Sequence, residues 1–196
     1  MRGGAQTHQV RIIGGQWKRT RLTVADKPGL RPTPDRVRET LFNWLGQDLS
    51  GWRCIDVFAG TGALGLEAAS RGAAQVLLVE QDAALVARLS GTCTQLQAGM
   101  VKVLRGDGLA ALERLAAASM DLVLIDPPFG SDLFAKALSA SSRCLAARGF
   151  VYLEAPRAWE PQALEDLGFV LHRHLKAGAV HAHLLRPRES GPVQAA

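Results

Sequence analysis

From residue 54 onward, short apolar runs alternate with segments that have the composition of helices. Parallel strands need long crossover connections, usually helices, so this alternation favours a parallel sheet with helices on both faces. The last two runs are separated only by AGA and predict a closing hairpin. The sequence therefore predicts an α/β fold, a doubly wound, mostly parallel sheet of seven strands. The seven runs are CIDVF, VLLVE, VKVLR, DLVLID, GFVYLEA, FVLHRHLK and VHAHLLRP.

The length of 196 residues suits one domain with a small appendage. Chains of this size bury about 70% of their unfolded surface, so the fold requires no disulfide or metal. The three cysteines, Cys54, Cys93 and Cys144, are scattered and odd in number, as is typical of reduced thiols in a cytoplasmic protein. We find no secretory signal and no run of about 20 apolar residues that would predict a membrane helix.

Basic residues are concentrated at the start of the chain. Residues 1–53 contain ten Arg or Lys and four Asp or Glu, whereas the rest of the chain carries a net charge of −1. A basic segment joined to a near-neutral domain is typical of a nucleic-acid-binding extension, although a solubilising surface would have the same composition. We therefore predict an N-terminal extension over 1–53, a main domain over 54–186 and a loose tail over 187–196.

The N-terminal extension contains two recognisable elements. The segments QVRIIGG and TRLTV flank QWKR and predict a basic β-ribbon. After an extended loop, PDRVRETLFNWLG has the apolar spacing of an amphipathic helix. We expect Thr33 or Asp35 to start this helix and Gly46 to end it.

The segment DVFAGTGALG places a glycine-rich turn between the first strand and the first helix of the main domain. A strand, a glycine turn and a helix together let a ligand approach the backbone closely. Gly60, Gly62 and Gly65 also fit the dinucleotide fingerprint, which is a weak signal by itself. Asp56, which precedes this turn, and a later acid at Asp107 favour another nucleotide-like ligand over NAD.

Acidic residues stand at four successive strand ends: Asp56, Glu80, Asp107 and Asp126. Ligands of open α/β sheets bind along these ends, and Glu80 has a spacing suited to accepting from ribose hydroxyls. Asp107 is placed to accept from an adenine amino group. This acidic rim suits a ligand with a cationic centre, a ribose and an adenine, which predicts S-adenosylmethionine as the cofactor. Each acid alone is explained more simply as a helix cap, but four in succession weaken that explanation.

The fourth strand ends in the sequence DPPF. Pro127 and Pro128 fix φ and remove two N–H donors, so the loop presents acceptors. Asp126 and a loop carbonyl, expected to be that of Pro127, can accept from an exocyclic amino group, and Phe129 offers a face for a base. Asp126 can also take the proton that the amine loses. A stiff turn without function is the alternative interpretation, and the strand-end acids make it the weaker one.

We expect no covalent or metal chemistry from the cysteines and histidines. The cysteines fall inside predicted strands or helices, where they suit core packing rather than attack on a pyrimidine. Four histidines alternate along the closing hairpin, and we expect them to face solvent in pairs because the predicted chemistry needs no metal. These histidines are His172, His174, His181 and His183.

Over residues 10–186 the chain resembles the bacterial 16S ribosomal RNA guanine-N2 methyltransferase family. The matching segments are RIIGGQWKRTRL, LRPTPDRVRETLFNWLG, DVFAGTGALGLEAASRGA and LVLIDPPF. The resemblance implies a class I, Rossmann-like methyltransferase domain, with S-adenosyl-L-methionine as donor and a guanine 2-amino group as acceptor. It also implies 16S rRNA within the small ribosomal subunit or its assembly intermediate as partner. The protein is then expected to be a cytoplasmic monomer without membrane contact.

The resemblance also assigns expected roles to residues of this chain. The catalytic residues that would hold the target base are Asp126, Pro127, Pro128 and Phe129. The cofactor-binding residues are Asp56, Phe58, Gly60, Thr61, Gly62, Glu80, Gln81, Asp107, Gly108 and Asp126. The RNA-binding residues are Arg11, Lys18, Arg19, Arg21, Arg31, Arg36 and Arg38. No metal ligands are expected, and Thr92 stands where relatives often have asparagine.

The basic ribbon is expected to bind phosphates, which positions the protein without reading base sequence. The target base must be exposed or flipped out to reach Phe129. Trp17 can stack on a base, but packing is the simpler expectation for a single tryptophan.

Three alternatives remain open from the sequence. Amino methylation of adenine or cytosine in DNA uses closely similar loops. An NAD-dependent oxidoreductase could be built on GTGALG. A non-catalytic RNA-binding assembly factor with a remnant cofactor fold would keep the basic extension, although the intact DPPF sequence argues against it.

Overall fold

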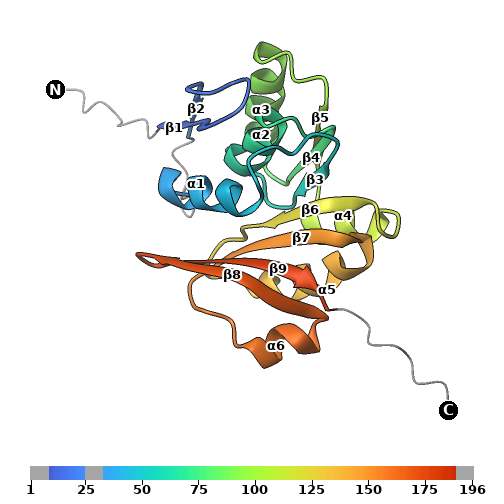
Figure 1. Ribbon diagram of the computed structural model, residues 1–196. Coiled ribbons are helices and arrows are strands. Elements are labelled where there is room, and N and C mark those ends of the chain that lie inside the picture. The colour runs from blue at the N-terminus through green and yellow to red at the C-terminus, as the bar shows by residue number, and fades with distance from the viewer. Residues whose placement is uncertain (1–8, 25–32, 189–196) are drawn as a thin grey trace.

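A seven-stranded sheet forms the centre of the computed structural model, which describes residues 9–24 and 33–188 (Figure 1). The strand order is β5-β4-β3-β6-β7-β9-β8. The first five strands in this order are parallel, and β9 runs antiparallel to both of its neighbours. This topology confirms the predicted doubly wound fold and closing hairpin. The strands are β3 (Arg53–Asp56), β4 (Gln75–Glu80), β5 (Val101–Arg105), β6 (Met120–Ile125), β7 (Leu145–Ala155), β8 (Phe169–Ala177) and β9 (Val180–Pro187).

The strand order reverses next to β3, which pairs with β4 on one side and with β6 on the other. Chain crossovers leave in opposite directions from such a point, which opens a crevice outside the carboxyl ends of the strands. Ile55 pairs with Leu77 in β4 and with Val123 in β6. Asp56, the last residue of β3, therefore lies at the middle of this edge of the sheet.

Helices cover both faces of the sheet and enclose two hydrophobic clusters (Figure 1). One cluster contains Leu41, Leu66 and Leu89 from α1, α2 and α3, and the other contains Leu112 and Leu138 from α4 and α5. All three cysteines pack in or against these clusters, as expected. The helices are α1 (Asp35–Trp44), α2 (Ala63–Ser70), α3 (Ala83–Gln95), α4 (Gly108–Arg114), α5 (Leu133–Cys144) and α6 (Pro161–Asp166).

The predicted N-terminal ribbon is present as β1 (Gln9–Arg11) and β2 (Arg21–Thr23), which pair antiparallel. Val10 and Leu22 face each other across the ribbon and are buried in the same cluster as α1 and α2. Trp17 packs partly buried against that cluster. The ribbon thus shares its hydrophobic contacts with the main domain, and the division at residue 53 remains a prediction.

A buried ionic cluster attaches the ribbon to α2. The fully buried Glu67 carboxylate accepts from the backbone N–H groups of Ile13 and Gly14, each at 2.7 Å. The same carboxylate pairs with Arg38 at 3.2 Å and with Arg71 at 2.9 Å. Removing one partner from a buried ion pair strands the other charge at a cost of about 3–5 kcal/mol, so this cluster fixes the ribbon against the domain.

Two further expectations concern the ends of elements. The helix α1 begins at Asp35, one of the two residues expected to start it, but Pro34 is the N-cap and no side chain caps the helix. Gly46 follows the last turn with φ of 90°, a conformation that glycine adopts without strain. Residues 189–196 of the predicted tail lie outside the described residues. No helix within 9–24 and 33–188 has the length and apolar character needed to cross a membrane.

Candidate active site

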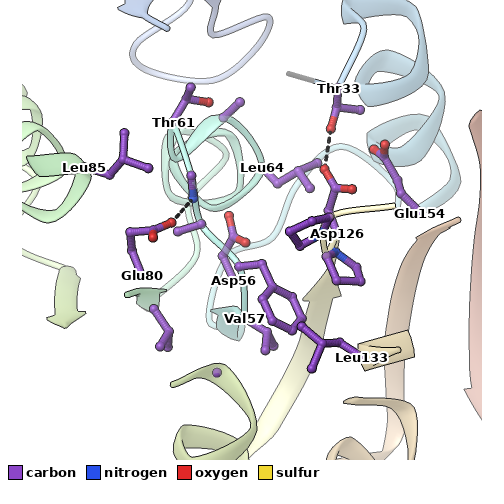
Figure 2. A pocket seen from close by; sticks show the side chains of 18 of the residues that line it. Thr33, Asp56, Val57, Thr61, Leu64, Glu80, Leu85, Asp126, Leu133 and Glu154 are labelled. Carbon is purple, nitrogen blue, oxygen red and sulfur yellow. Dashed lines mark hydrogen bonds between the residues drawn. The ribbon is translucent and has the colours of Figure 1, made fainter. Parts of the chain in front are cut away.

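A cavity of about 660 Å³ opens at the carboxyl ends of β3, β4, β6 and β7 (Figure 2). Its wall divides into a part formed by the β3–α2 turn and the end of β4, and a part formed by the loop after β6 and the end of β7. We call these the cofactor side and the acceptor side. Eleven of the predicted site residues line the cavity, and none of the predicted basic residues that the structure describes does so. The eleven are Asp56, Phe58, Gly60, Thr61, Glu80, Gln81, Gly108, Asp126, Pro127, Pro128 and Phe129.

Asp126 is the one residue of this set that was predicted both as a catalytic and as a cofactor-binding residue. Two predicted cofactor residues, Gly62 and Asp107, do not line the cavity but lie beside residues that do. Gly62 is the N-cap of α2 with φ of 78°, and a Cβ there would come within 2.6 Å of Leu89. Its glycine therefore serves the close packing of the turn against α3.

Backbone N–H groups hold the carboxylate of Glu80 on the cofactor side. Gly60 N donates to Glu80 Oε2 at 2.9 Å, which Figure 2 marks by a dashed line. Asp82 N donates to Oε1 at 2.8 Å. Each carboxylate oxygen can accept more than one hydrogen bond, so capacity remains for a ligand hydroxyl. This arrangement fixes an acceptor at the end of β4 where the sequence predicted one.

Asp107 is the N-cap of α4. A helix cap is the simpler explanation that the sequence offered for any single acid at a strand end. Asp107 Oδ1 accepts from Ala110 N at 2.8 Å, and its Oδ2 accepts from the Gln81 side chain at 2.8 Å. Gly108 lines the cavity, and a Cβ at this position would lie 2.4 Å from the Val57 carbonyl oxygen. Only glycine fits there, and the adenine-binding role of Asp107 remains a prediction.

Asp56 lies on the floor of the cavity between the two sides and is almost fully buried. Its Oδ2 accepts from Gly65 N at 3.0 Å, whereas Oδ1 is buried without a hydrogen-bond partner among the described residues. Burial raises the pKa of this carboxyl to about 7, although the Gly65 hydrogen bond opposes the rise. A buried polar atom without a partner is costly, so this oxygen suits a polar or cationic ligand in the cavity.

On the acceptor side, the four residues of the DPPF loop all line the cavity. Asp126 Oδ2 accepts from the Thr33 hydroxyl at 3.3 Å (Figure 2). Burial, followed by the charges of Glu154 and Asp56, raises the pKa of the Asp126 carboxyl well above its ordinary value. The loop therefore presents a carboxyl group with a high affinity for a proton beside an aromatic ring, Phe129.

Two polar residues of the acceptor side, Thr33 and Glu154, were not predicted as site residues from the sequence. Glu154 lies near the end of β7, is buried, and accepts from the Tyr152 hydroxyl at 2.7 Å. Burial raises its pKa, although the hydrogen bonds from Tyr152 and Thr33 and the charge of Arg38 oppose the rise. The other acids were predicted because they follow buried apolar runs, and Glu154 has the same position near the end of the fifth apolar run. Thr33 had been considered only as a helix cap.

The basic residues predicted to bind RNA divide into exposed and buried ones. Arg11, Lys18, Arg19 and Arg21 are exposed on the ribbon, and Arg36 is exposed on α1. Arg11 pairs with Asp35 at 2.8 Å. Arg31 lies outside the described residues.

The prediction for Arg38 is corrected by the structure. Its side chain has no exposed surface, and its guanidinium binds Glu67, the Arg11 carbonyl oxygen and Asp35. These contacts occupy the donors that would otherwise reach a phosphate. Arg38 therefore joins the ribbon to α1 and α2 and does not contact RNA.

The closing hairpin forms a second positive region. The net charge of −1 over residues 54–196 did not reveal it, because acids elsewhere in that part of the chain balance its basic residues. Residues 169–188 contain no acid, whereas Arg173, Lys176, Arg186 and Arg188 are exposed on them. Val180, at the start of β9, lines the cavity. The tip of the hairpin is therefore close to the opening where a polyanionic substrate would enter.

The hairpin histidines do not all face solvent, which corrects that expectation. His183 is fully buried, where its Nε2 accepts from Trp159 N at 3.2 Å. Burial lowers its pKa to about 4. His174 and His181 do form a pair, with 3.0 Å between Nε2 and Nδ1. Within 9–24 and 33–188, no three His, Cys, Asp or Glu side chains form a group that could hold a metal ion.

Comparisons with known proteins agree with this geometry. The model of the family described as "Conserved hypothetical protein 95" matches residues 10–186. The chain is 40% identical to Ribosomal RNA small subunit methyltransferase D of Escherichia coli over 93% of this chain and 91% of the relative. It is 36% identical to the Haemophilus influenzae protein of the same name, over 84% of this chain and 92% of the relative. The solved structure described as a putative methyltransferase yhhF from Escherichia coli has a TM-score of 0.79 at 36% identity, covering 92% of this chain and 99% of that one.

Proposed function

Since the chain belongs to the Conserved hypothetical protein 95 family, we propose that it methylates the exocyclic N2 of a guanine in 16S rRNA of the small ribosomal subunit. It is an RNA methyltransferase of the class I, Rossmann-like type, as its relatives are. The names of these relatives do not favour the alternatives of a DNA amino-methyltransferase, an oxidoreductase or a non-catalytic factor. The substrate particle is the small subunit or an intermediate of its assembly, and the reaction takes place in the cytoplasm.

One observation supports the proposal most strongly: a single cavity has Glu80 and the glycine turn on one wall and the DPPF loop on the other. The first wall suits S-adenosyl-L-methionine, because Glu80 offers oxygens to ribose hydroxyls and Asp56 offers an unpartnered buried oxygen. When bound, this cofactor supplies an electrophilic methyl group on a sulfonium. Phe58, Thr61, Gln81 and Gly108 complete the proposed cofactor-binding wall.

The acceptor side is proposed to orient the guanine amine. Asp126 and the carbonyl of Pro127 accept from its two N–H bonds, which leaves the nitrogen lone pair free to point across the cavity. Phe129 stacks on the base, a contact worth about 1–3 kcal/mol. Holding the amine in this direction lowers the entropic part of the barrier. Asp126 then accepts the proton that the methylated nitrogen loses.

The ribbon and the hairpin tip are proposed to hold the RNA around the target base. Lys18, Arg19 and Arg21 are exposed on the ribbon, and Lys176 is exposed near the cavity opening. Contacts of this kind bind phosphates and release counterions, so affinity should fall steeply with salt. The base itself must leave its stack to reach the cavity.

Methyl transfer onto unmodified particles tests the proposal. Small ribosomal subunits from a strain that lacks this activity are incubated with the purified protein and labelled S-adenosylmethionine, and the modified nucleoside is identified by mass spectrometry. We expect N2-methylguanosine in 16S rRNA. A methylated adenine or cytosine would replace the proposed acceptor, and the absence of any labelled nucleoside from free RNA, subunits and assembly intermediates alike would refute the proposal.

A further inference from the structure

Two buried carboxyl groups on the acceptor side share one hydroxyl. The Thr33 hydroxyl donates to Asp126 Oδ2 at 3.3 Å, and Thr33 is also close enough to the Glu154 carboxyl to lower the pKa of that group. Figure 2 shows Thr33, Asp126 and Glu154 together at one side of the cavity. A threonine hydroxyl has a single proton, so it cannot donate to both carboxyl groups at once.

The surroundings of the two carboxyl groups are unequal. Glu154 receives a hydrogen bond from the Tyr152 hydroxyl at 2.7 Å and lies in the field of the buried Arg38 guanidinium. Asp126 accepts a longer hydrogen bond, from Thr33 at 3.3 Å, and no cation of residues 9–24 and 33–188 is among the causes that shift its pKa. Hydrogen bonds and a nearby cation both favour the ionised form of a carboxyl. Glu154 is therefore the better supported anion of the pair.

We propose that Glu154 is a positioning residue for methyl transfer, which acts on Asp126 through Thr33 and through its own negative charge. This inference rests on the proposed function, since it concerns the group that accepts the proton of the guanine amine. Thr33 holds the Asp126 carboxyl in place at the cavity wall. The charge of Glu154 favours proton uptake by Asp126, because like charges close together disfavour a second ionised group.

Methyl transfer releases a proton, and the negative charge of Glu154 helps Asp126 to take it up. Methylation of an exocyclic amine forms a C–N bond, breaks the bond between methyl and sulfur, and releases one proton from nitrogen. The positive charge of the sulfonium disappears in the same step, while its electron pair stays on sulfur. A proton taken up by Asp126 removes one negative charge at the same time, so the net charge of the cavity is unchanged.

The groups that act on the pair come from β3, β7, α1 and the segment before α1. Asp126 faces Asp56 at the end of β3 and Glu154 on β7, and Thr33 contacts it from the segment before α1. Glu154 faces Tyr152 on its own strand and Arg38 on α1. Burial raises the pKa of both carboxyl groups.

The test replaces the charge of Glu154 by an amide of the same shape. We expect Glu154→Gln to move the acid limb of the single-turnover pH–rate profile to lower pH by about one unit, because Asp126 ionises more readily without a charged neighbour. The maximal rate should fall roughly tenfold, because Asp126 becomes a weaker proton acceptor. Tyr152→Phe, which removes a donor to Glu154, should cause a smaller shift in the same direction.

A second measurement needs no methyl transfer. Calorimetry in two buffers of different ionisation enthalpy reports the protons released when S-adenosylmethionine binds, and the neutral S-adenosylhomocysteine serves as the control ligand. Wild-type protein should release a proton from Asp126 on binding the cationic ligand, and Glu154→Gln should release less at the same pH. If that variant does not fold, Thr33→Val removes the shared hydroxyl while Glu154 remains, and its pH–rate profile is measured instead. It should lower the rate at every pH.

Two results would overturn the inference. One is an acid limb and a proton release that are the same in Glu154→Gln and in wild type, since Glu154 would then have only a packing role. The other is a Thr33→Val variant with the wild-type rate at every pH. A protein that shows the expected proton release but methylates no guanine would instead refute the proposed function and leave the electrostatic coupling between Glu154 and Asp126 in place.

Discussion

The two sides of the cavity hold their carboxyl groups in different ways. On the cofactor side, backbone N–H groups donate to both oxygens of Glu80 at 2.8–2.9 Å. On the acceptor side, side-chain hydroxyls donate, from Thr33 to Asp126 and from Tyr152 to Glu154. Backbone donors are fixed by the fold, whereas a hydroxyl can rotate and can donate or accept.

Under the proposed function, this difference suits the cofactor side to binding and the acceptor side to the uptake of a proton. Fixed N–H donors favour one ionised, oriented carboxylate, which suits recognition of hydroxyl groups. The raised pKa values of Asp126 and Glu154, caused first by burial, show carboxyl groups whose proton occupancy is sensitive to nearby charge. A cationic ligand that enters the cavity would change that occupancy, because it favours ionised carboxyl groups.

The largest expected effect comes from the acceptor side. We expect Asp126→Ala to lower methyl transfer by at least about 100-fold, because both an acceptor for the amine and the proton acceptor are lost. Cofactor affinity should change by only a few fold, as measured by calorimetry. Asp132→Ala is the matched control, because Asp132 is an exposed acid that pairs with Lys136 at 2.5 Å. Wild-type turnover in Asp126→Ala would remove this residue from the mechanism.

The cofactor side should give the opposite pattern. Glu80→Ala leaves Gly60 N and Asp82 N without their acceptor and removes the proposed ribose contact. Hydrogen bonds to charged groups contribute about 1.5–3 kcal/mol, so cofactor affinity should fall roughly 10- to 100-fold. The rate at saturating cofactor should stay within a few fold of wild type. Glu113→Ala, on the exposed surface of α4, is the control. A large loss of rate with unchanged cofactor affinity would mean that the two sides of the cavity do not have separate roles.

Much of this division could be predicted from the sequence, because strand-end acids follow directly from the apolar pattern. Parallel strands bring their carboxyl ends to one edge, so Asp56, Glu80 and Asp126 meet there whatever the details of the helices. Glu154 also stands near the end of an apolar run, but it could be predicted as a site residue only if β7 was expected to reach the cavity. The hydroxyl of Thr33 had no signal, since it comes from the segment before α1 and lies 93 residues from Asp126 in sequence.

Arg38 shows why the RNA surface was harder to predict than the cavity. Its neighbours Arg36 and Glu39 are exposed, and charge alone does not reveal which arginine of a helix is buried. Burial of Arg38 depends on Glu67, which lies on α2 in the main domain and meets α1 only in the folded chain. Contacts between distant segments of this kind cannot be read from local composition.

The ribbon offers a smaller effect that should leave both sides of the cavity intact. Arg19→Glu combined with Arg21→Glu is expected to weaken binding to small subunits about tenfold near physiological salt and to reduce the salt dependence of binding. Cofactor affinity should be unchanged. Arg114→Glu combined with Arg148→Glu changes the same charge at exposed positions outside the ribbon, on α4 and β7, and should bind normally. Equal losses of RNA and cofactor binding would mean that the ribbon supports the fold.

The last expected effect is on stability instead of activity and concerns Asp56, which lies between the two sides. Its pKa of about 7 in the folded protein is above the ordinary value of 3.8. Between these values the folded state binds a proton that the unfolded state releases, so stability falls as pH rises. One such group lowers the free energy of unfolding by about 1.4 kcal/mol per pH unit. We expect Asp56→Asn to remove this contribution between about pH 5 and pH 7, as measured by urea denaturation.

A control with the opposite shift makes the Asp56 prediction specific. Asp121 is held by Arg53, mainly through a side-chain hydrogen bond, which lowers its pKa. Its contribution to stability is lost only as pH falls below the ordinary carboxyl range, so Asp121→Asn should leave the slope between about pH 5 and pH 7 unchanged. If Asp56→Asn keeps the wild-type slope, the proton that stabilises the folded protein resides on Asp126 or Glu154. The acceptor side alone would then be the part of the cavity that changes its charge.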